Sequence, residues 1–401
     1  MVTIADRLQR IKPSPSSMAG QRARELRMQG KDIIGLTSGE PDFDTPENIK
    51  EAAERALRNG QTKYTDVGGV PPLKEAIVQK FSRENSLEYV KEEVIVCTGA
   101  KQAIFNAFMC TINPGDEVVI ASPYWVSYPD IALLVDGRPV FVESKAENGF
   151  KMSAEDLEAA ITDRTRWVVL NSPNNPSGAV YSSDQLAALA SVLERHPKIM
   201  VLTDDIYEHI IYDGRPYATI AAVAPAMKDR TLTVNGVSKA FAMTGWRLGY
   251  AAGPRELVRS MVKLQSQSTS NASSVSQAAA LEALTGPQDL IGERLKLYTR
   301  RRDYVISRLS DIEGLDCHVP EGAFYVFPSC DHYFGSRAPD GTVIHGAEDF
   351  VRYLLDSEGL VVLPGTAYGV AAHFRISFAT SMEMLEEGCA RLERACRKLR
   401  K

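Results

Sequence analysis

Helical stretches alternate with short runs of β-branched residues from Glu47 onward, and this alternation restricts the fold more than any other feature of the chain. It is typical of strands joined by crossover helices. Most of the runs are continuously apolar, which suits strands that helices cover on both faces. The expected strands are 94–97, 117–121, 139–143, 167–171, 199–203, 231–235 and 248–252. The sequence therefore predicts an α/β fold.

A change of pattern near the middle of the chain indicates a second domain. Residues 255–283 and 287–310 have helical periodicity, and the pair Gly286-Pro287 separates them. The segments GAFYVF and FRISFA then supply strands for another sheet. Single cores stop growing at about 250 to 300 residues, so a chain of 401 residues favours two domains. We predict an N-terminal arm with part of the small domain over 1–45, a large domain over 46–295 and a small α+β domain over 296–401.

The composition argues against several kinds of partner. The chain has 46 basic and 51 acidic side chains and a formal net charge of -5, so it lacks the basic field that a nucleic acid requires. Asp6, Arg7 and Arg10 interrupt the first apolar residues, which does not fit a signal peptide, and no apolar stretch is long enough to cross a membrane. The six cysteines form no CxxC pair. We expect a cytoplasmic protein with free thiols and without a metal, nucleic-acid or membrane partner.

The segment NGVSKAFAMTGWRLGY carries the most specific motif. It places Lys239 on a turn rich in Gly and Ser, and Arg247 follows eight residues later. An amine and a guanidinium in this arrangement could converge on one small anionic ligand. The alternative is a solvated loop lysine and a surface arginine.

The segment VLTDDIYEHIIY ends an apolar strand with Asp204 and Asp205, and Tyr207 follows. Proteins of the α/β class bind ligands at the ends of parallel strands. At such an end a carboxylate could pair with a cationic heterocycle, and a phenol could donate a hydrogen bond to an oxyanion. A helix cap or a carboxylate pair for a metal ion is the alternative.

Two further segments supply turns where a ligand could bind. NSPNNPSGAVY is rich in turn residues, and Asn175 at its centre either directs an amide toward a site or only builds the turn. VCTGAKQAIFNAF leads from a strand into a helix through Gly99, Ala100 and Lys101. The first N–H groups of a helix lack partners, so this turn predicts a phosphate site, although any βα unit has a similar turn.

Taken together with SGEPDFDTP, PYWVSYP and FRISFATS, these segments resemble the pyridoxal-phosphate aminotransferases of fold type I, class I. Within that family the chain is similar to the bacterial branch that includes aspartate and prephenate aminotransferases. The resemblance runs from about Lys12 to the last helix. It implies a mostly parallel, mixed sheet covered by helices, a second, smaller α+β domain, and pyridoxal 5'-phosphate bound by the large domain.

The resemblance also implies residue roles around the cofactor ring. Lys239 would be the catalytic residue and would bind the cofactor covalently, and Asp204 would pair with the ring nitrogen. Tyr207 and Asn175 would donate hydrogen bonds to the ring oxygen. Ser238, next to the lysine, would also bind the cofactor, whereas many members of the family carry a phosphate-binding serine three residues before the lysine.

The cofactor phosphate would be held by the helix start and by two side chains. The resemblance assigns the amides of Ala100 and Lys101, which follow Gly99, and the guanidinium of Arg247. The hydroxyl of Tyr64 would reach the phosphate from the neighbouring subunit. A homodimer with shared sites is therefore implied.

Substrate contacts follow from the same resemblance. Arg375 would bind the α-carboxylate with its planar fork. Trp125 would stack on the cofactor and contact the substrate; the alternative is a core aromatic. Lys101 and Lys12 would bind a second carboxylate, with Ser16 near the same entrance. The implied substrate-binding residues are Gly39, Trp125, Asn175, Arg375, Lys101 and Lys12.

The favoured function is that of an aspartate aminotransferase, which transfers the amino group of L-aspartate to 2-oxoglutarate by a ping-pong mechanism. One alternative is a prephenate aminotransferase that uses glutamate or aspartate as donor and forms arogenate. A C–S lyase on the same fold is a second, because fold alone does not separate these reactions. A ligand-sensing regulator would need a DNA-binding module, and few residues precede SGEPDF.

Overall fold

The computed structural model describes residues 2–401, and the side chain of Ser16 lies outside the described part. Within these residues the central sheet has seven strands in the order β2-β8-β7-β6-β5-β3-β4. The strands are β2 (Val94–Cys97), β3 (Glu117–Ser122), β4 (Arg138–Glu143), β5 (Thr165–Asn171), β6 (Met200–Asp204), β7 (Thr231–Gly236) and β8 (Gly249–Ala252). Only β8 runs antiparallel to its neighbours in this sheet. The predicted mostly parallel, mixed sheet is confirmed.

Both faces of the central sheet are covered by helices, and this explains the continuous apolar runs. In β2, Val94 and Val96 pack against one layer of helices and Ile95 and Cys97 against the other. One layer consists of α4 (Ala100–Thr111), α5 (Ser127–Leu134) and α9 (Arg255–Ser266). The other contains α3 (Pro71–Asn85), α6 (Ala154–Ala160), α7 (Ser183–Glu194), α8 (Ile220–Val223) and α10 (Ser274–Thr285), with α2 (Glu47–Arg58) packed on α10.

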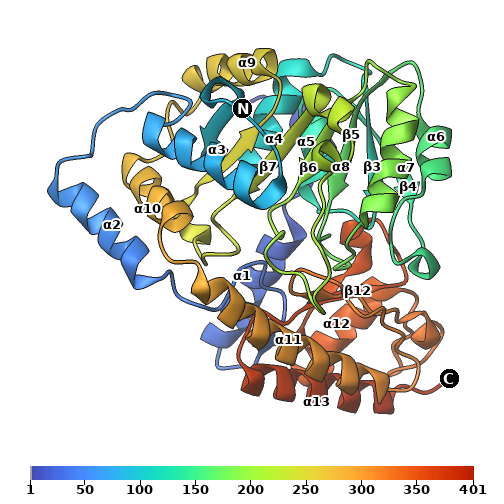
Figure 1. Ribbon diagram of the computed structural model, residues 1–401. Coiled ribbons are helices and arrows are strands. Elements are labelled where there is room, and N and C mark those ends of the chain that lie inside the picture. Colours follow the sequence, from blue (N-terminus) through green and yellow to red (C-terminus); the bar gives the residue numbers. More distant parts are fainter. Residues whose placement is uncertain (1) are drawn as a thin grey trace.

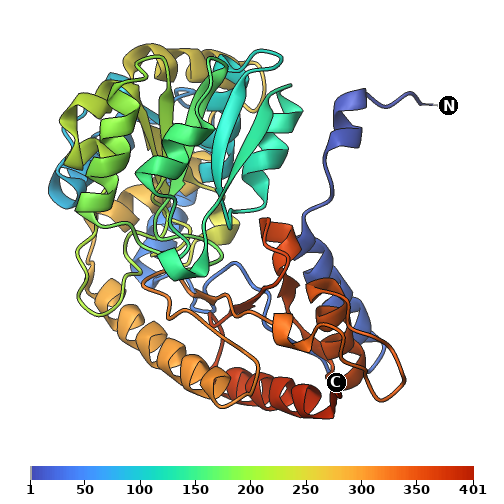
Figure 2. The ribbon, with the colours of Figure 1, turned by 90° about the vertical axis from the view of Figure 1, so that its right-hand side faces the viewer.

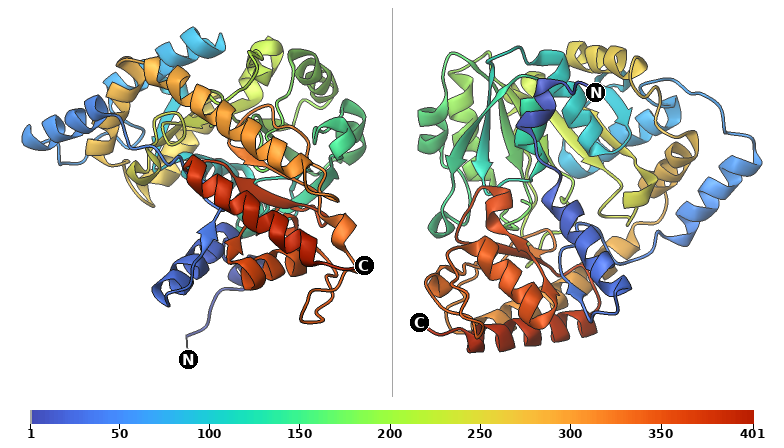
Figure 3. Two further views of the ribbon diagram at one scale, coloured as in Figure 1. Left: turned by 90° about the horizontal axis from the view of Figure 1, so that it is seen from below. Right: turned by 180° about the vertical axis from the view of Figure 1, so that it is seen from behind.

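A second group of elements lies below the central sheet in the view of Figure 1. Its strands are β1 (Ile34–Gly35), β9 (Tyr325–Val326), β10 (Leu360–Val361), β11 (Leu363–Pro364) and β12 (Phe374–Ser377). Its helices are α1 (Pro15–Met28), α11 (Asp289–Ser310), α12 (Ala347–Glu358) and α13 (Met382–Lys398). Figure 3 shows α11 and α13 side by side beneath the small sheets. The residue limits of the two predicted domains stay predictions.

The first residues join the two groups. The 3₁₀ helix η1 (Asp6–Arg10) runs beside the central sheet, away from α1, as Figure 2 shows. Its Arg10 forms an ion pair of 2.6 Å with Asp136. The other 3₁₀ helices are η2 (Lys91–Glu93), η3 (Ala146–Asn148), η4 (Pro225–Arg230), η5 (Thr244–Trp246), η6 (Asp331–Tyr333) and η7 (Gly365–Tyr368).

The helix expected over residues 255–283 is wrong as a single element. It is broken between α9 and α10, and Ser270 within the break has a φ of +60°. Ser268 and Asn271 hydrogen-bond to nearby carbonyl oxygens, and the side chain of Ser273 caps α10. Short polar side chains compete in this way with helical hydrogen bonds. The polar run SQSTSNAS was the signal for the break.

No helix within residues 2–401 is both long and apolar enough to span a bilayer. The six cysteines of the described chain are free thiols.

Candidate active site

A cavity of about 660 Å³ lies between the carboxyl ends of the central strands and the small sheets. Such a position is where ligands bind in α/β proteins. Most of the expected site residues line it, although they come from all parts of the chain. They are Gly39, Ala100, Lys101, Trp125, Asn175, Asp204, Tyr207, Ser238, Lys239, Arg247 and Arg375.

Asp204 ends β6 and is buried at the floor of the cavity. Its Oδ2 accepts a hydrogen bond of 2.7 Å from the hydroxyl of Tyr128. Burial raises the pKa of Asp204 to about 6, while the hydrogen bond from Tyr128 opposes the rise. Asp205 does not line the cavity, and one of its oxygens accepts a hydrogen bond from Thr203 at 2.6 Å. Of the adjacent acids, Asp204 is therefore the one available to a ligand.

Lys239 follows β7 and projects into the same cavity. Its Nζ donates a hydrogen bond of 2.5 Å to the carbonyl oxygen of Gly39, which comes from the N-terminal part of the chain. Burial lowers the pKa of Lys239 to about 8, and the positive charges of Arg375 and Arg247 add to this effect. The lowered pKa leaves a larger share of neutral amine near neutral pH than an ordinary lysine has, which suits both nucleophilic attack and proton removal.

The start of α4 lies close to Arg247, and together they present hydrogen-bond donors to the cavity. Ala100 and Lys101 are its first two residues, whose N–H groups have no acceptor within a helix. Gly99 precedes them with a φ of +84°, and a Cβ there would lie 2.5 Å from an Nη atom of Arg247. A Cβ on Gly249 of β8 would lie 2.2 Å from the nitrogen of Ala100. Two glycines thus allow the guanidinium and a strand to approach the helix start.

Arg375 of β12 is buried and is held in a fixed orientation. Its guanidinium donates to the Oδ1 of Asn175 at 2.9 Å and to the carbonyl oxygen of Thr37 at 2.7 Å. The ring of Tyr325 lies 4.3 Å from it. Its Nε has no hydrogen-bond partner, and no carboxylate among the described residues pairs with it. A buried cation without a counter-ion is costly, so this arrangement calls for an anionic ligand.

Tyr207 and Asn175 stand between these groups. The hydroxyl of Tyr207 lies 2.8 Å from that of Tyr325, and the backbone N–H of Asn175 donates to Asn171 at 2.9 Å. Both side chains are buried. Burial raises the pKa of Tyr207 well above its usual value, so its hydroxyl stays protonated and can donate.

Three expected residues lie outside the wall of the cavity. Gly99 stands just behind the helix start, as described above. Lys12 lines a separate pocket between α1 and α12. Tyr64 is 90% exposed, far more than a buried core tyrosine would be. The predicted roles of Lys12 and Tyr64 stay predictions.

Sequence reasoning missed several residues of the cavity wall. Tyr128 belongs to the segment PYWVSYP and lies three residues after Trp125. This spacing, close to one helical turn, could have placed Tyr128 on the same side as Trp125. Arg24 and Arg27 of α1 also line the cavity. They lie outside every motif, so only the structure finds them.

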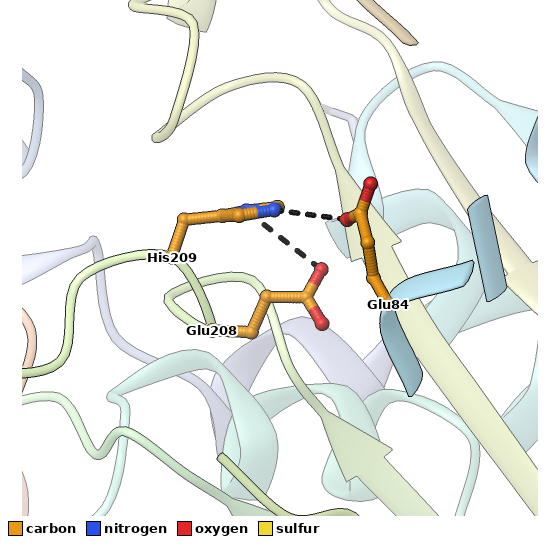
Figure 4. Close-up of side chains that lie close together, drawn as sticks. All are labelled: Glu84, Glu208 and His209. Atoms are coloured by element: carbon orange, nitrogen blue, oxygen red, sulfur yellow. Dashed lines mark hydrogen bonds and ion pairs between the residues drawn. The ribbon is translucent and has the colours of Figure 1, made fainter. Parts of the chain in front are cut away.

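A second polar cluster, formed by Glu84, Glu208 and His209, has the spacing of metal ligands (Figure 4). His209 contacts both carboxylates, at 3.0 Å from Glu84 and 3.8 Å from Glu208. The ammonium of Lys80 contacts Glu208, and Asn235 donates to the same oxygen. Although burial opposes ionisation, the hydrogen bond from His209 and the charge of Lys80 lower the pKa of Glu84 to about 2. Lys80 thus supplies the positive charge in this cluster, which braces the loop after β6 against α3.

The chain is similar to known proteins over nearly its whole length. The chain matches the family model described as aminotransferase class I and II over residues 31–392. It is 54% identical to a probable aspartate/prephenate aminotransferase of Rhizobium leguminosarum bv. phaseoli, across 99% of each chain. The crystal structure of an aspartate aminotransferase from Rhizobium meliloti superposes with a TM-score of 0.97, at 52% identity over 100% of both chains. An aspartate aminotransferase from Thermus thermophilus with maleate gives a TM-score of 0.91 and 44% identity, over 98% of this chain and 100% of the other.

Proposed function

The chain belongs to the class I and II aminotransferases, and on this premise we propose that it transfers the amino group of L-aspartate to 2-oxoglutarate with pyridoxal 5'-phosphate as cofactor. The observation that carries the proposal is the buried guanidinium of Arg375, which pairs with no carboxylate of residues 2–401 as described and lines one cavity with Lys239 and Asp204. An amino acid supplies the missing carboxylate.

The residues of the cavity fit this cofactor. Its phosphate suits the start of α4 and Arg247, where glycine at position 99 leaves room for the guanidinium. Its ring nitrogen suits the buried carboxylate of Asp204, and its aldehyde suits the amine of Lys239. When bound, pyridoxal phosphate supplies an electron sink that makes the Cα–H bond of an amino acid acidic.

Each side chain then has a distinct task. Arg375 holds the α-carboxylate by two parallel N–H donors and fixes the orientation of Cα. Lys239 removes the proton from Cα with Nζ, for which a pKa of about 8 is well matched. Asp204, buried at the floor of the cavity, would stay ionised next to the ring nitrogen and would favour its positive form. Tyr207 and Asn175 donate hydrogen bonds to the ring oxygen.

The preference for acidic substrates rests on a second cation. Lys101 lies with its Nζ 4.9 Å from the ring of Trp125, at the cavity wall. We assign it to the distal carboxylate of aspartate or 2-oxoglutarate. The structure of the Thermus thermophilus relative was solved with maleate, a dicarboxylate, which supports a preference for substrates with two carboxylates.

Prephenate is the second candidate substrate. Several relatives of more than 50% identity carry the name aspartate/prephenate aminotransferase, either outright or as probable. Prephenate also has two carboxylates, so Arg375 and Lys101 serve it equally well. Lys12, which lines the separate pocket between α1 and α12, is proposed as a further contact for it.

The proposed assembly is a homodimer. Tyr64 is an aromatic side chain with 90% of its surface exposed, on the loop between α2 and α3. We assign its hydroxyl to the cofactor phosphate of the neighbouring subunit.

A screen of acceptors tests the substrate assignment. The purified enzyme with added pyridoxal phosphate is given aspartate or glutamate as donor, and oxaloacetate, 2-oxoglutarate, prephenate, pyruvate or phenylpyruvate as acceptor. We expect the highest kcat/KM for aspartate with 2-oxoglutarate. A higher value for prephenate would make that reaction the principal one. Release of pyruvate and ammonia from cysteine, without transamination, would identify a lyase and contradict the proposal.

A further inference from the structure

One face of α1 forms a wall of the cavity. Ser17, Gly20, Arg24 and Arg27 line it, and their spacing of three and four residues places them on one side of the helix. The two arginines add positive charge to a cavity that already contains those of Lys239, Arg247 and Arg375. Only Glu40 and Asp204 contribute carboxylates to its described lining.

The two arginines of α1 differ in their contacts. Arg27 is occupied, because its Nε donates a hydrogen bond of 3.0 Å to the carbonyl oxygen of Ile33. A Cβ on Gly35 would lie 3.3 Å from its Nη2, so the guanidinium rests on the backbone of β1. Arg27 therefore shapes the wall but has little freedom to meet a ligand.

Arg24 has no hydrogen bond or ion pair with any residue in the described range 2–401. Its guanidinium turns back along the helix and lies over Gly20, where a Cβ would be 3.5 Å from Nη1. Helical side chains point toward the N-terminus in this way. Because position 20 has no side chain, the guanidinium can lie against the helix and face the cavity.

Each other cation of the cavity already has a task in the proposed mechanism. Arg247 is assigned to the phosphate, Arg375 to the α-carboxylate and Lys239 to the reacting carbon. Lys101 lies against the ring of Trp125 at the cavity wall. Among the described residues that line the cavity, Arg24 is the arginine whose guanidinium makes no hydrogen bond or ion pair. A guanidinium at this place is suited to a carboxylate at the far end of a substrate.

We infer that Arg24 is a specificity-determining residue, which binds the distal carboxylate of dicarboxylic substrates longer than aspartate, such as glutamate, 2-oxoglutarate and prephenate. This inference rests on the proposed function and extends it. Lys101 contacts the second carboxylate of short and long substrates alike, and Arg24 adds a further contact from α1 to the second carboxylate of the longer ones. The fork of Arg24 raises affinity for the long substrates and leaves the reacting carbon untouched, so it acts on KM more than on kcat.

The test compares Arg24→Gln and Arg24→Lys with the matched control Arg22→Gln. Arg22 stands on the same helix, pairs with Glu25 at 3.7 Å and does not line the cavity. Calorimetry on the holoenzyme measures binding of glutarate, a dicarboxylate that cannot react, and of butyrate, which has one carboxylate. Steady-state kinetics measure kcat and KM for glutamate, aspartate and alanine.

For Arg24→Gln we expect glutarate affinity and kcat/KM for glutamate to fall roughly 10- to 100-fold, the range for a hydrogen bond to a charged group. Butyrate and alanine should change less than about threefold, and Arg24→Lys should recover part of the loss. Equal losses for both classes, unchanged glutarate binding, or the same effect in Arg22→Gln would overturn the inference. If the wild-type enzyme itself does not favour dicarboxylates, the proposed function fails as well, so the two failures are distinguishable.

Discussion

Replacement of Asp204 by Asn separates two effects of the buried carboxylate: its effect on the stability of the apoprotein and its effect on turnover. The substitution keeps the size of the side chain and removes the carboxylate. Burial raises the pKa of Asp204 from 3.8 to about 6, so the folded apoprotein binds this proton more tightly than the unfolded chain does. The carboxyl therefore costs stability progressively as the pH rises from about 4 to about 6. Above pH 6 the full cost is about 3 kcal/mol, at about 1.4 kcal/mol per pKa unit.

We expect Asp204→Asn to make the apoprotein more stable at high pH. Part of the cost is already present at pH 4.5, so the free energy of unfolding of Asp204→Asn relative to wild type should grow by about 2 kcal/mol between pH 4.5 and pH 8. Equilibrium unfolding in urea at the two pH values measures this difference. Turnover of the holoenzyme should fall at least ~100-fold, because an uncharged amide does not hold the ring nitrogen in its positive form.

Asp205→Asn is the control for the same pair of measurements. Burial raises the pKa of Asp205 to about 7, so its replacement should give a similar dependence of stability on pH. Its side chain is outside the cavity, and turnover should therefore persist. If the difference in free energy of unfolding between Asp204→Asn and wild type did not change with pH, ionisation of Asp204 would not destabilise the folded apoprotein. If Asp204→Asn retained full turnover, Asp204 would not be the partner of the ring nitrogen.

Three further substitutions address the remaining roles. Lys239→Ala should fold but lose turnover, and borohydride treatment followed by peptide mapping should attach the cofactor to Lys239 in the wild type; a label on another lysine would contradict the assignment. Arg375→Lys keeps the charge but loses the fork, so kcat/KM should fall roughly 10- to 100-fold for every amino-acid donor alike; a defect confined to acidic donors would place Arg375 at the distal carboxylate instead. Lys101→Ala should lower kcat/KM for aspartate, glutamate and prephenate by roughly 1.5 to 3 kcal/mol and largely spare alanine and phenylalanine. Equal losses for acidic and neutral donors would show that Lys101 serves only the cofactor.

The strands of the central sheet could be read from the sequence because burial on both faces makes them continuously apolar. All the expected strands of that sheet are present, with ends that coincide or differ by at most two residues. Lys239 and Arg375 could likewise be predicted, because the residues that flank them in the sequence form recognisable motifs. Their convergence on one cavity was implied by resemblance and not by periodicity.

Other parts of the site carry no local signal. The role of Tyr128 depends on its contact with Asp204, which lies 76 positions away in the chain. Arg24 is one of several arginines in α1, and only the cavity distinguishes it from Arg22. The break after α9 does have a local signal, the Ser- and Asn-rich run SQSTSNAS. The helical spacing of the apolar residues around this run nevertheless predicts one continuous helix.

The hydrogen bond between Arg375 and the carbonyl of Thr37 has a consequence for the timing of biosynthesis. The two residues are separated by 338 positions. At synthesis rates of about 5 to 20 residues per second, Thr37 is made roughly 17 to 70 seconds before its partner. The N-terminal wall of the cavity can therefore form this contact only when the last tenth of the chain has been made. The proposed binding of an amino acid by Arg375 is possible only when translation is nearly finished.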